Sequence, residues 1–383
     1  MSSSEKKRKS RTKRSPKSTP NPSLPDDLVV SCLARVSRLY YPNLSLVSKS
    51  FRSILASPEL YKTRTLLGRT ETFLYVCLHF PEETNPRWFT LYRKPNPTLT
   101  NCSIQKKKKK KMKKEEGSSC NLLTPIPVLN SLPLESLYPV VVGSNLYAIS
   151  AAIEDSPCSN VTFLDCRTQT WLEAPRMRLA QTNGEFEGKM YLAGSSENTD
   201  SMNFVEVYNT KTQTWKTVSP EKRIFKLGNL EGKIYMNFDV ESHRERVAFK
   251  PKDLTWEVLG IDADLDGVSI CMIENITYSY IGMFAWRKFN TKGAAWRSLK
   301  GLEGLPKFAS ESTVKMADYG GKLVVLWDEY VPASGQKEKM IWCAEISLEK
   351  RKNEEIWGKV EWFDRVLTVP KSYKFECAVA ATV

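Results

Sequence analysis

The chain has 383 residues, of which 41% are apolar, and a formal net charge of +14. Most of this charge lies in two segments: residues 1–22 carry eight Lys or Arg against one Glu, and residues 106–116 carry eight Lys against two Glu. The remainder is close to neutral, which argues against a basic nucleic-acid-binding face on the folded part of the chain. The sequence has no apolar run of about 18 residues and no basic start followed by an apolar segment, so we expect neither a membrane span nor a secretion signal.

Residues 1–21 consist mainly of Ser, Lys, Arg and Pro and have almost nothing to bury, so we expect a disordered basic tail. Within it, Lys6–Lys9 followed by Arg11 looks like a nuclear import signal. A solubilising tail is the alternative interpretation. The expected location is therefore the nucleus, the cytoplasm or both.

The segment from Ser23 to Gly68 has the spacing of three short helices. Pro25 suits a first helical turn, and Asp26 and Asp27 favour the positive end of a helix dipole. Two series of apolar residues with helical spacing follow: Leu28, Val29, Cys32, Leu33 and Val36, and then Leu44, Val47, Phe51, Ile54 and Leu55. A third helix is expected from Glu59 to Leu67, after the stop at Ser57-Pro58. Three such helices bury little apolar surface, which favours an interaction module.

The run SLPDDLVVSCLARVSRLYYPNLSLVSKSFRSILASPELY resembles an F-box in its Leu-Pro start, its Val-Ser-Lys step and the Phe that follows. The resemblance implies a domain over residues 22–68 that docks by an apolar helical surface onto a Skp-family adaptor and, through it, a cullin-RING ubiquitin ligase. By position, it places this adaptor-binding role on Leu24, Pro25, Leu28, Val29, Leu33, Val47 and Phe51. A helical hairpin packed on the rest of the chain is the alternative.

Residues 101–121 form a Lys-rich insert that includes six consecutive lysines. Like charges at this density repel each other and stay solvated, so we expect the insert to be disordered. It could contact RNA or anionic lipid. Because no aromatic residues are interleaved for base stacking, a specific nucleic-acid role is not expected.

Beyond residue 138 the chain repeats itself with a period of 44 residues. Glu187–Tyr191 (EGKMY) returns as Glu231–Tyr235 (EGKIY), and Asp165–Trp171 (DCRTQTW) returns as Asn209–Trp215 (NTKTQTW). The Trp series continues with Trp256, Trp296 and Trp357. A turn, an apolar strand and a late Trp at such a period indicate radial β-repeats, whose sheets cannot bury both faces alone. Unrelated sandwich strands with coincidental Trp spacing are the alternative.

The pattern resembles the kelch repeat, although the paired glycine of that repeat is reduced to Gly194 in one copy. The runs FLYVCLHFPEETNPRWFTLYRKPN and IWCAEISLEKRKNEEIWGKVEW also resemble the plant F-box/kelch-repeat family. The resemblance implies a mainly β fold, a six-bladed kelch-type β-propeller over residues 72–383 preceded by a small three-helix F-box domain. Repeats are expected at about residues 139–181, 182–227, 228–267, 268–311 and 312–363, with a composite closing blade from residues 72–127 and 373–383.

In an up-and-down blade, the turns between the first and second strands and between the third and fourth strands emerge on one face. The other connections emerge on the opposite face. In this sequence the first kind are short and the second kind are long. Tight turns are expected at Glu187–Lys189 and Asn209–Gln213. Long connections are expected at residues 150–160, 194–203, 239–246 and 328–339, together with the links after each Trp. Variable loops on a rigid ring often bind partners, so we expect a protein substrate on this loop face, with Arg244 and Tyr330 as candidate contacts. The F-box is expected on the tight-turn face.

The sequence offers little for catalysis. The two histidines, His79 and His243, lack a matched set of metal ligands, and no phosphate-binding loop or acid, base and nucleophile set is visible. We therefore expect no catalytic residue, no metal and no cofactor. The predicted function is that of the substrate-recognition subunit of an SCF-type (Skp–cullin–F-box) ubiquitin ligase. The alternatives are a propeller scaffold that no longer engages the ligase, and a nuclear nucleic-acid-associated protein acting through its lysine tracts.

Overall fold

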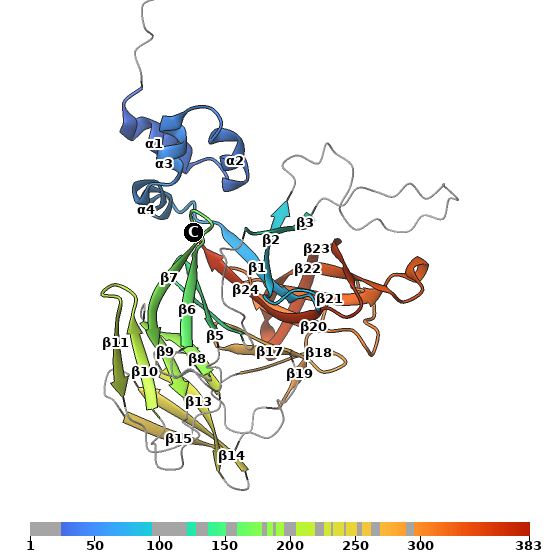
Figure 1. Cartoon of the computed structure of the whole chain (residues 1–383). Helices are drawn as coiled ribbons and strands as arrows, with labels where there is room; N and C mark the ends of the chain where they lie inside the picture. Colours follow the sequence, from blue (N-terminus) through green and yellow to red (C-terminus); the bar gives the residue numbers. More distant parts are fainter. Residues whose placement is uncertain are drawn as a thin grey trace, which may run out of the picture.

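The structure, a computed structural model, consists of a helical domain above a set of β-sheets (Figure 1). It describes residues 24–93, 121–127, 137–150, 159–177, 182–186, 189–194, 204–218, 226–230, 233–240, 243–250, 255–261, 269–288 and 295–383. The predicted basic tail and all of the Lys-rich insert except Asn121 lie outside these residues. Within the described residues, no helix is both long and apolar enough to cross a membrane.

The helical domain comprises α1 (Asp26–Ala34), η1 (Arg38–Tyr40), α2 (Tyr41–Leu44), α3 (Lys49–Leu55) and α4 (Pro58–Leu66). The prediction of one helix from Leu44 to Leu55 is wrong, because Ser48 is extended and begins a new helix. Its hydroxyl accepts a hydrogen bond from the backbone N–H of Phe51 at 3.1 Å. Such an N-cap satisfies a backbone donor that the helix itself cannot pair.

The remainder of the described chain forms six four-stranded antiparallel sheets. The first two contain β24 (Lys374–Thr382), β1 (Thr72–His79), β2 (Arg87–Arg93) and β3 (Asn121–Pro125), and then β4 (Leu137–Val142), β5 (Asn145–Ser150), β6 (Ser159–Asp165) and β7 (Thr170–Met177). The next two contain β8 (Thr182–Phe186), β9 (Lys189–Gly194), β10 (Phe204–Asn209) and β11 (Thr214–Val218), and then β12 (Lys226–Leu230), β13 (Lys233–Val240), β14 (His243–Lys250) and β15 (Thr255–Ile261). The last two contain β16 (Ser269–Ile273), β17 (Ile276–Tyr280), β18 (Phe284–Lys288) and β19 (Arg297–Ser298), and then β20 (Val314–Asp318), β21 (Leu323–Tyr330), β22 (Glu338–Arg351) and β23 (Glu355–Pro370).

The first of these sheets, which we call the closing sheet, joins the two ends of the β region in the order β24-β1-β2-β3. Strand β24 pairs with β1 in antiparallel register from Thr72 opposite Thr382 onward. Glu71 and Val383 extend the ladder by exchanging two backbone hydrogen bonds of 2.8 and 2.9 Å. This is the pairing that the composite closing blade requires.

Neighbouring sheets meet mainly through their first strands. Contacts join β24 to β4, β4 to β8, β8 to β12, β16 to β20 and β20 to β24. Apolar clusters fill the spaces between sheets: Leu74 and Ile341 lie between the closing sheet and the β20–β23 sheet, and Trp327 lies between the latter and the β16–β19 sheet. Among the described residues, β12 and β16 make no contact of similar extent, so ring closure between them stays a prediction.

The repeated turn sequence has a local physical cause. Asp165 accepts a hydrogen bond from the backbone N–H of Arg167 at 2.9 Å, and Asn209 accepts one from that of Lys211 at 3.0 Å. Each turn ends on a glutamine with positive φ, 57° at Gln169 and 54° at Gln213. The side chains of Asp and Asn thus organise the turn from β6 to β7 and from β10 to β11.

The prediction of a long connection at residues 239–246 is wrong. Asp239 pairs with Arg244 and Val240 with His243, so β13 and β14 continue almost to the end of a short hairpin. The polar residues of this stretch resembled a loop in the sequence, but an antiparallel strand with a solvated face also accepts polar residues. Arg244 therefore lies in strand β14 instead of a loop.

Candidate functional site

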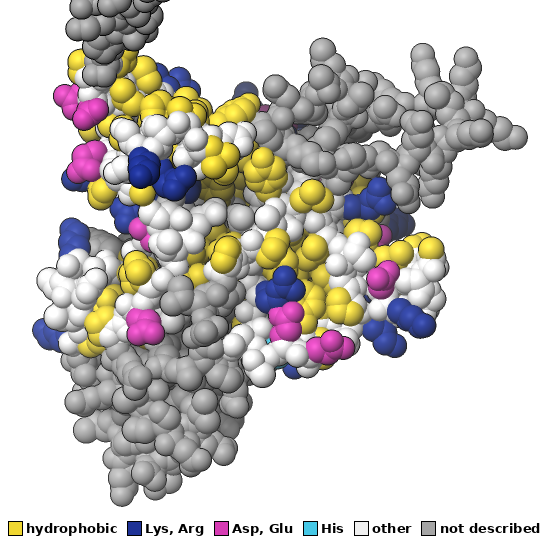
Figure 2. All heavy atoms as spheres, turned by 45° about the horizontal axis from the view of Figure 1, so that its top comes forward, with side chains coloured by type: hydrophobic (Ala, Val, Ile, Leu, Met, Phe, Trp, Pro, Cys, Tyr) yellow, Lys and Arg dark blue, Asp and Glu magenta, His cyan; other side chains and the backbone are white. Residues whose placement is uncertain are grey.

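Large apolar side chains are exposed on the helical domain. Leu24 and Leu28 are 56% and 53% exposed at the start of α1, and Leu46 and Val47 are 77% and 64% exposed between α2 and α3. Figure 2 shows hydrophobic side chains gathered on this domain. Exposed apolar groups that form a patch mark interaction surfaces. We call these four residues the exposed apolar set.

The other predicted adaptor-binding residues occupy different environments. Pro25 is exposed, whereas Val29 and Phe51 are half-buried and pack against the core of the helical domain. Leu33 is only 4% exposed within that core, so the structure excludes it from the surface. Its helical spacing could not separate inward from outward positions, because both follow the same period. Leu46 received no adaptor-binding role from the sequence, although it belongs to the Leu46-Val47-Ser48-Lys49 stretch that carries the F-box resemblance.

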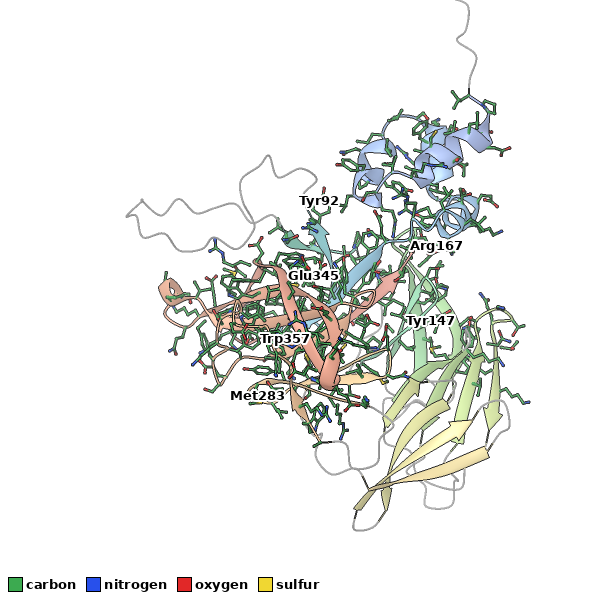
Figure 3. The ribbon with its side chains drawn as sticks, turned by 180° about the vertical axis from the view of Figure 1, so that it is seen from behind. Tyr92, Tyr147, Arg167, Met283, Glu345 and Trp357 are labelled. Atoms are coloured by element: carbon green, nitrogen blue, oxygen red, sulfur yellow. The ribbon has the colours of Figure 1, made fainter. Side chains whose placement is uncertain are left out.

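The helical domain rests on the β-sheets through Arg38. Its Nη2 donates hydrogen bonds to the carbonyl oxygens of Cys166 at 2.8 Å and Arg167 at 2.7 Å, in the turn between β6 and β7. The guanidinium also lies 4.5 Å from the centroid of the Phe73 ring. Tyr61 donates a further hydrogen bond to the Arg167 carbonyl at 2.8 Å. Figure 3 shows Arg167 directly below the helical domain.

Glu71 joins the helical domain to the closing sheet. Its carboxylate accepts a hydrogen bond from the backbone N–H of Arg38 at 2.9 Å and forms an ion pair with Arg64 at 3.1 Å. Its backbone pairs with Val383 beside β24. The helical domain is therefore held at a tight turn and at the closing sheet, and the exposed apolar set lies outside α4, the helix nearest the sheets (Figure 1).

The two candidate substrate contacts are not brought together in the described part of the chain. Tyr330 ends β21 opposite Lys339, whose Nζ lies 5.1 Å from the centroid of the Tyr330 ring. Arg244 stands opposite Asp239 in the β12–β15 sheet, and its side chain lies outside the described residues. The connection after Tyr330 contains the short helix η2 (Pro332–Ser334). The loop predicted over residues 328–339 is therefore present but shorter, because Asp328 to Tyr330 pair with Lys339 to Ile341.

A buried ion pair lies close to Tyr330. Asp328 is 1% exposed and accepts hydrogen bonds from Lys339 Nζ at 3.0 Å, from Tyr373 Oη at 2.7 Å and from the backbone N–H of Thr313 at 2.8 Å. Burial, and then the Asp328 carboxylate, raise the pKa of Tyr373, so its hydroxyl stays protonated and donates. These contacts join β21 and β22 to Tyr373, which directly precedes β24, and indicate a structural role.

Metal chemistry has no visible site in the described residues, where no group of three His, Cys, Asp or Glu side chains could hold an ion. His79 Nε2 lies 3.0 Å from the carbonyl oxygen of Glu83, to which it donates. The side chain of His243 lies outside the described residues.

Comparison with known families assigns both parts of the chain. A family model described as the FKB95 kelch-repeats domain matches residues 88–367, and an F-box domain model matches residues 22–63. The chain belongs to the F-box/kelch-repeat family. It is 66% identical over 385 residues to the F-box/kelch-repeat protein At5g48990 of Arabidopsis thaliana, with 100% of both chains covered. It is 65% identical over 371 residues to the F-box/kelch-repeat protein At5g48980 of the same plant, covering 95% of this chain and 93% of that protein.

Two solved structures show weaker likeness. TolB from Acinetobacter baumannii matches with a TM-score of 0.45 and 9% identity over 87% of this chain and 73% of that one. YjhT matches with a TM-score of 0.36 and 12% identity over 62% of this chain and 95% of that one. These scores are too low to add to the assignment. The mainly β fold with an N-terminal F-box follows from the family and from the strands themselves.

F-box domains generally bind Skp-like adaptors of SCF ubiquitin ligases, and F-box/kelch proteins are typically non-catalytic adaptors. Membership therefore makes this chain an F-box protein of the substrate-adaptor kind, with a kelch region as its second part. The exposed apolar set falls within the residues matched to the F-box, and Tyr330 falls within those matched to the kelch region.

Proposed function

We propose that this F-box/kelch-repeat protein is the substrate-recognition subunit of an SCF-type ubiquitin ligase. The F-box binds the Skp-family adaptor, and the kelch region binds the protein that receives ubiquitin. The observation that carries the proposal is the exposed apolar set, because Leu24, Leu28, Leu46 and Val47 are left uncovered by the domain's own core. Fully burying a side chain of this size stabilises a complex by roughly 1.5–3 kcal/mol.

The anchoring of the F-box supports a second part of the proposal. Arg38, Tyr61 and Glu71 fix the domain on the sheets by contacts that do not use the exposed apolar set. An adaptor could therefore bind without displacing the kelch region. A fixed connection between the two binding parts raises the effective concentration of a bound substrate near the ligase. The protein would promote transfer without performing chemistry itself.

The substrate side of the proposal rests on the direction of the connections. The F-box contacts the tight turn from β6 to β7, which are the third and fourth strands of their sheet. The connection after Tyr330 joins β21 to β22, the second and third strands of another sheet, and such connections leave a sheet at the end opposite its tight turns. We place the protein substrate on that loop face, with Tyr330 as a described candidate contact. Arg244 remains a candidate by its place near the β13–β14 hairpin. The proposed location is the nucleus, the cytoplasm or both, and the basic tail favours the nucleus.

Replacing Leu28 and Val47 together with Asp is expected to weaken adaptor binding at least 30-fold, which corresponds to about 2 kcal/mol. Charge would then have to be desolvated on the apolar surface that the adaptor covers. Both positions are more than half exposed, and Leu28 lies in the first turn of α1, where a negative charge favours the helix. Binding of the full chain to a purified Skp-family adaptor, measured by titration calorimetry, provides the test.

Leu66→Asp is the matched control, because Leu66 is an 87% exposed apolar residue on α4. The control variant should bind the adaptor as the unaltered chain does. If the unaltered chain shows no adaptor binding, or if both variants bind equally well, the ligase-independent scaffold is the better account.

A further inference from the structure

Two cysteines face each other where the first and last strands of the kelch region pair. Cys77 of β1 stands directly opposite Cys377 of β24 in the antiparallel register. Side chains opposite each other in a sheet point to the same face. The other cysteines described within strands lack such a partner: Cys271 is opposite Tyr278, and Cys343 is opposite Leu326 and Asp364.

The hydrogen-bond pattern gives the spacing of this pair. Glu71 and Val383 exchange both of their backbone hydrogen bonds, and the register is unbroken from there to Cys77 and Cys377, six residues along each strand. Hydrogen-bonded pairs alternate with non-hydrogen-bonded pairs, so an even separation makes Cys77 and Cys377 a hydrogen-bonded pair as well. The Cα atoms of such pairs lie about 5.5 Å apart. Disulfides most often have a Cα separation of about 5.5–6 Å and a Cβ separation of about 3.5–4.5 Å. The Cβ atoms of a regular hydrogen-bonded pair lie farther apart than this, so the link requires a local shift of the strands, at the point where the register is broken after Cys77.

The two thiols differ in exposure. Cys77 is 0% exposed within the apolar cluster between the closing sheet and the β4–β7 sheet, whereas Cys377 is half-buried at its edge. Burial raises the pKa of Cys77, and the neighbouring Cys377 thiol acts in the same direction. Cys377 is therefore the thiol that a dissolved oxidant reaches first.

We propose that Cys77 and Cys377 form a redox modification site, at which oxidation by a peroxide links β1 and β24 through a disulfide. In the first step, the Cys377 thiolate attacks one peroxide oxygen, the O–O bond breaks, and Cys377 becomes a sulfenic acid as hydrogen peroxide is reduced to one water. In the second, the Cys77 sulfur displaces the sulfenic hydroxyl, the S–S bond forms, and the thiol proton leaves with that hydroxyl as a second water. A dithiol reductant reverses the link.

The link would fix the strand that completes the closing sheet. Strand β24 contacts both β4 and β20, so its loss would separate the sheets on either side. Crosslinking residues 300 positions apart removes many unfolded conformations of the chain. We expect oxidation to raise the thermal midpoint of the kelch region by roughly 5 °C. The proposal stands independently of what the kelch region binds.

The test uses the full chain, folded and reduced, then exposed to hydrogen peroxide, alkylated and digested with trypsin without reduction. The expected product is residues 70–87 linked to residues 375–383, the tryptic peptides that contain Cys77 and Cys377. Dithiothreitol should release both peptides and return the thermal midpoint to its starting value. Mass spectrometry and thermal unfolding supply the two readings.

Cys377→Ser should abolish the linked peptide and the thermal shift, whereas Cys32→Ser, at an exposed cysteine of the F-box, should leave both unchanged. The proposal is overturned if both peptides stay singly alkylated after oxidation of the folded chain. It is also overturned if the link forms only in urea, or if Cys77 pairs with another cysteine instead.

Discussion

Arg64→Ala is expected to unfold the F-box while the kelch region stays folded. Arg64 is 1% exposed, and its Nη1 donates hydrogen bonds to the carbonyl oxygens of Ala34 at 3.2 Å and Val36 at 2.7 Å and to Tyr41 Oη at 3.0 Å. Its Nη2 also pairs with Glu71. Removing it leaves these acceptors without their donor and opens a cavity. Leaving a buried polar group unsatisfied costs about 1–3 kcal/mol for each group, so we expect about 3–5 kcal/mol in total.

That cost is large for a domain whose core contains few apolar side chains, and whole domains are typically stable by only about 5–15 kcal/mol. Hydrogen exchange should therefore show loss of protection across α1 to α4 and unchanged protection in β20 to β23. Arg52→Ala is the matched control, since Arg52 is exposed on the neighbouring α3 and should change stability by less than about 0.5 kcal/mol. Equal protection in the two variants would show that Arg64 does not hold the helices together.

Asp328→Ala is expected to destabilise the kelch region by a similar amount, about 3–5 kcal/mol. The substitution leaves the Lys339 ammonium, which is 11% exposed, without its carboxylate. It also leaves the hydroxyl of Tyr373 and the backbone N–H of Thr313 without an acceptor. Because Tyr373 directly precedes β24, the loss should appear first at the closing sheet.

Urea unfolding followed by tryptophan fluorescence measures this effect. Glu303→Ala, at an exposed carboxylate, is the control and should stay within about 0.5 kcal/mol of the unaltered chain. Tyr373→Phe should cost about 1 kcal/mol alone and much less when combined with Asp328→Ala, because both changes remove the same hydrogen bond. Additive costs would show that the two residues act separately.

Long-range features of the fold could be predicted from the sequence where a repeat specified them. The recurring Trp occupies the second position of β7, β11 and β15, as Trp171, Trp215 and Trp256. The requirement that the sheets bury their faces against one another predicted that strands from the two ends would pair, and β1 and β24 do so. A repeat gives this information because each unit needs the same neighbours.

Contacts between residues far apart in sequence could not be predicted in this way. Arg38 and Arg64 were two basic residues among many in the sequence, yet both are buried against carbonyl oxygens. Leu33 and Leu28 share one helical period, but only the fold decides that Leu33 faces the core and Leu28 faces solvent. Apolar spacing identifies a helix more reliably than it identifies the face that binds a partner.

The most direct test of the proposed function compares the proteins bound by the full chain with those that receive ubiquitin. Proximity labelling in plant cells with the proteasome inhibited would be run on the unaltered chain, on the Leu28 and Val47 double Asp variant, and on Leu66→Asp. The proposal predicts at least one protein labelled equally by all three chains, with ubiquitin attached when the unaltered chain or Leu66→Asp is present and much less with the double variant. Equal ubiquitin on every labelled protein with all three chains would contradict it.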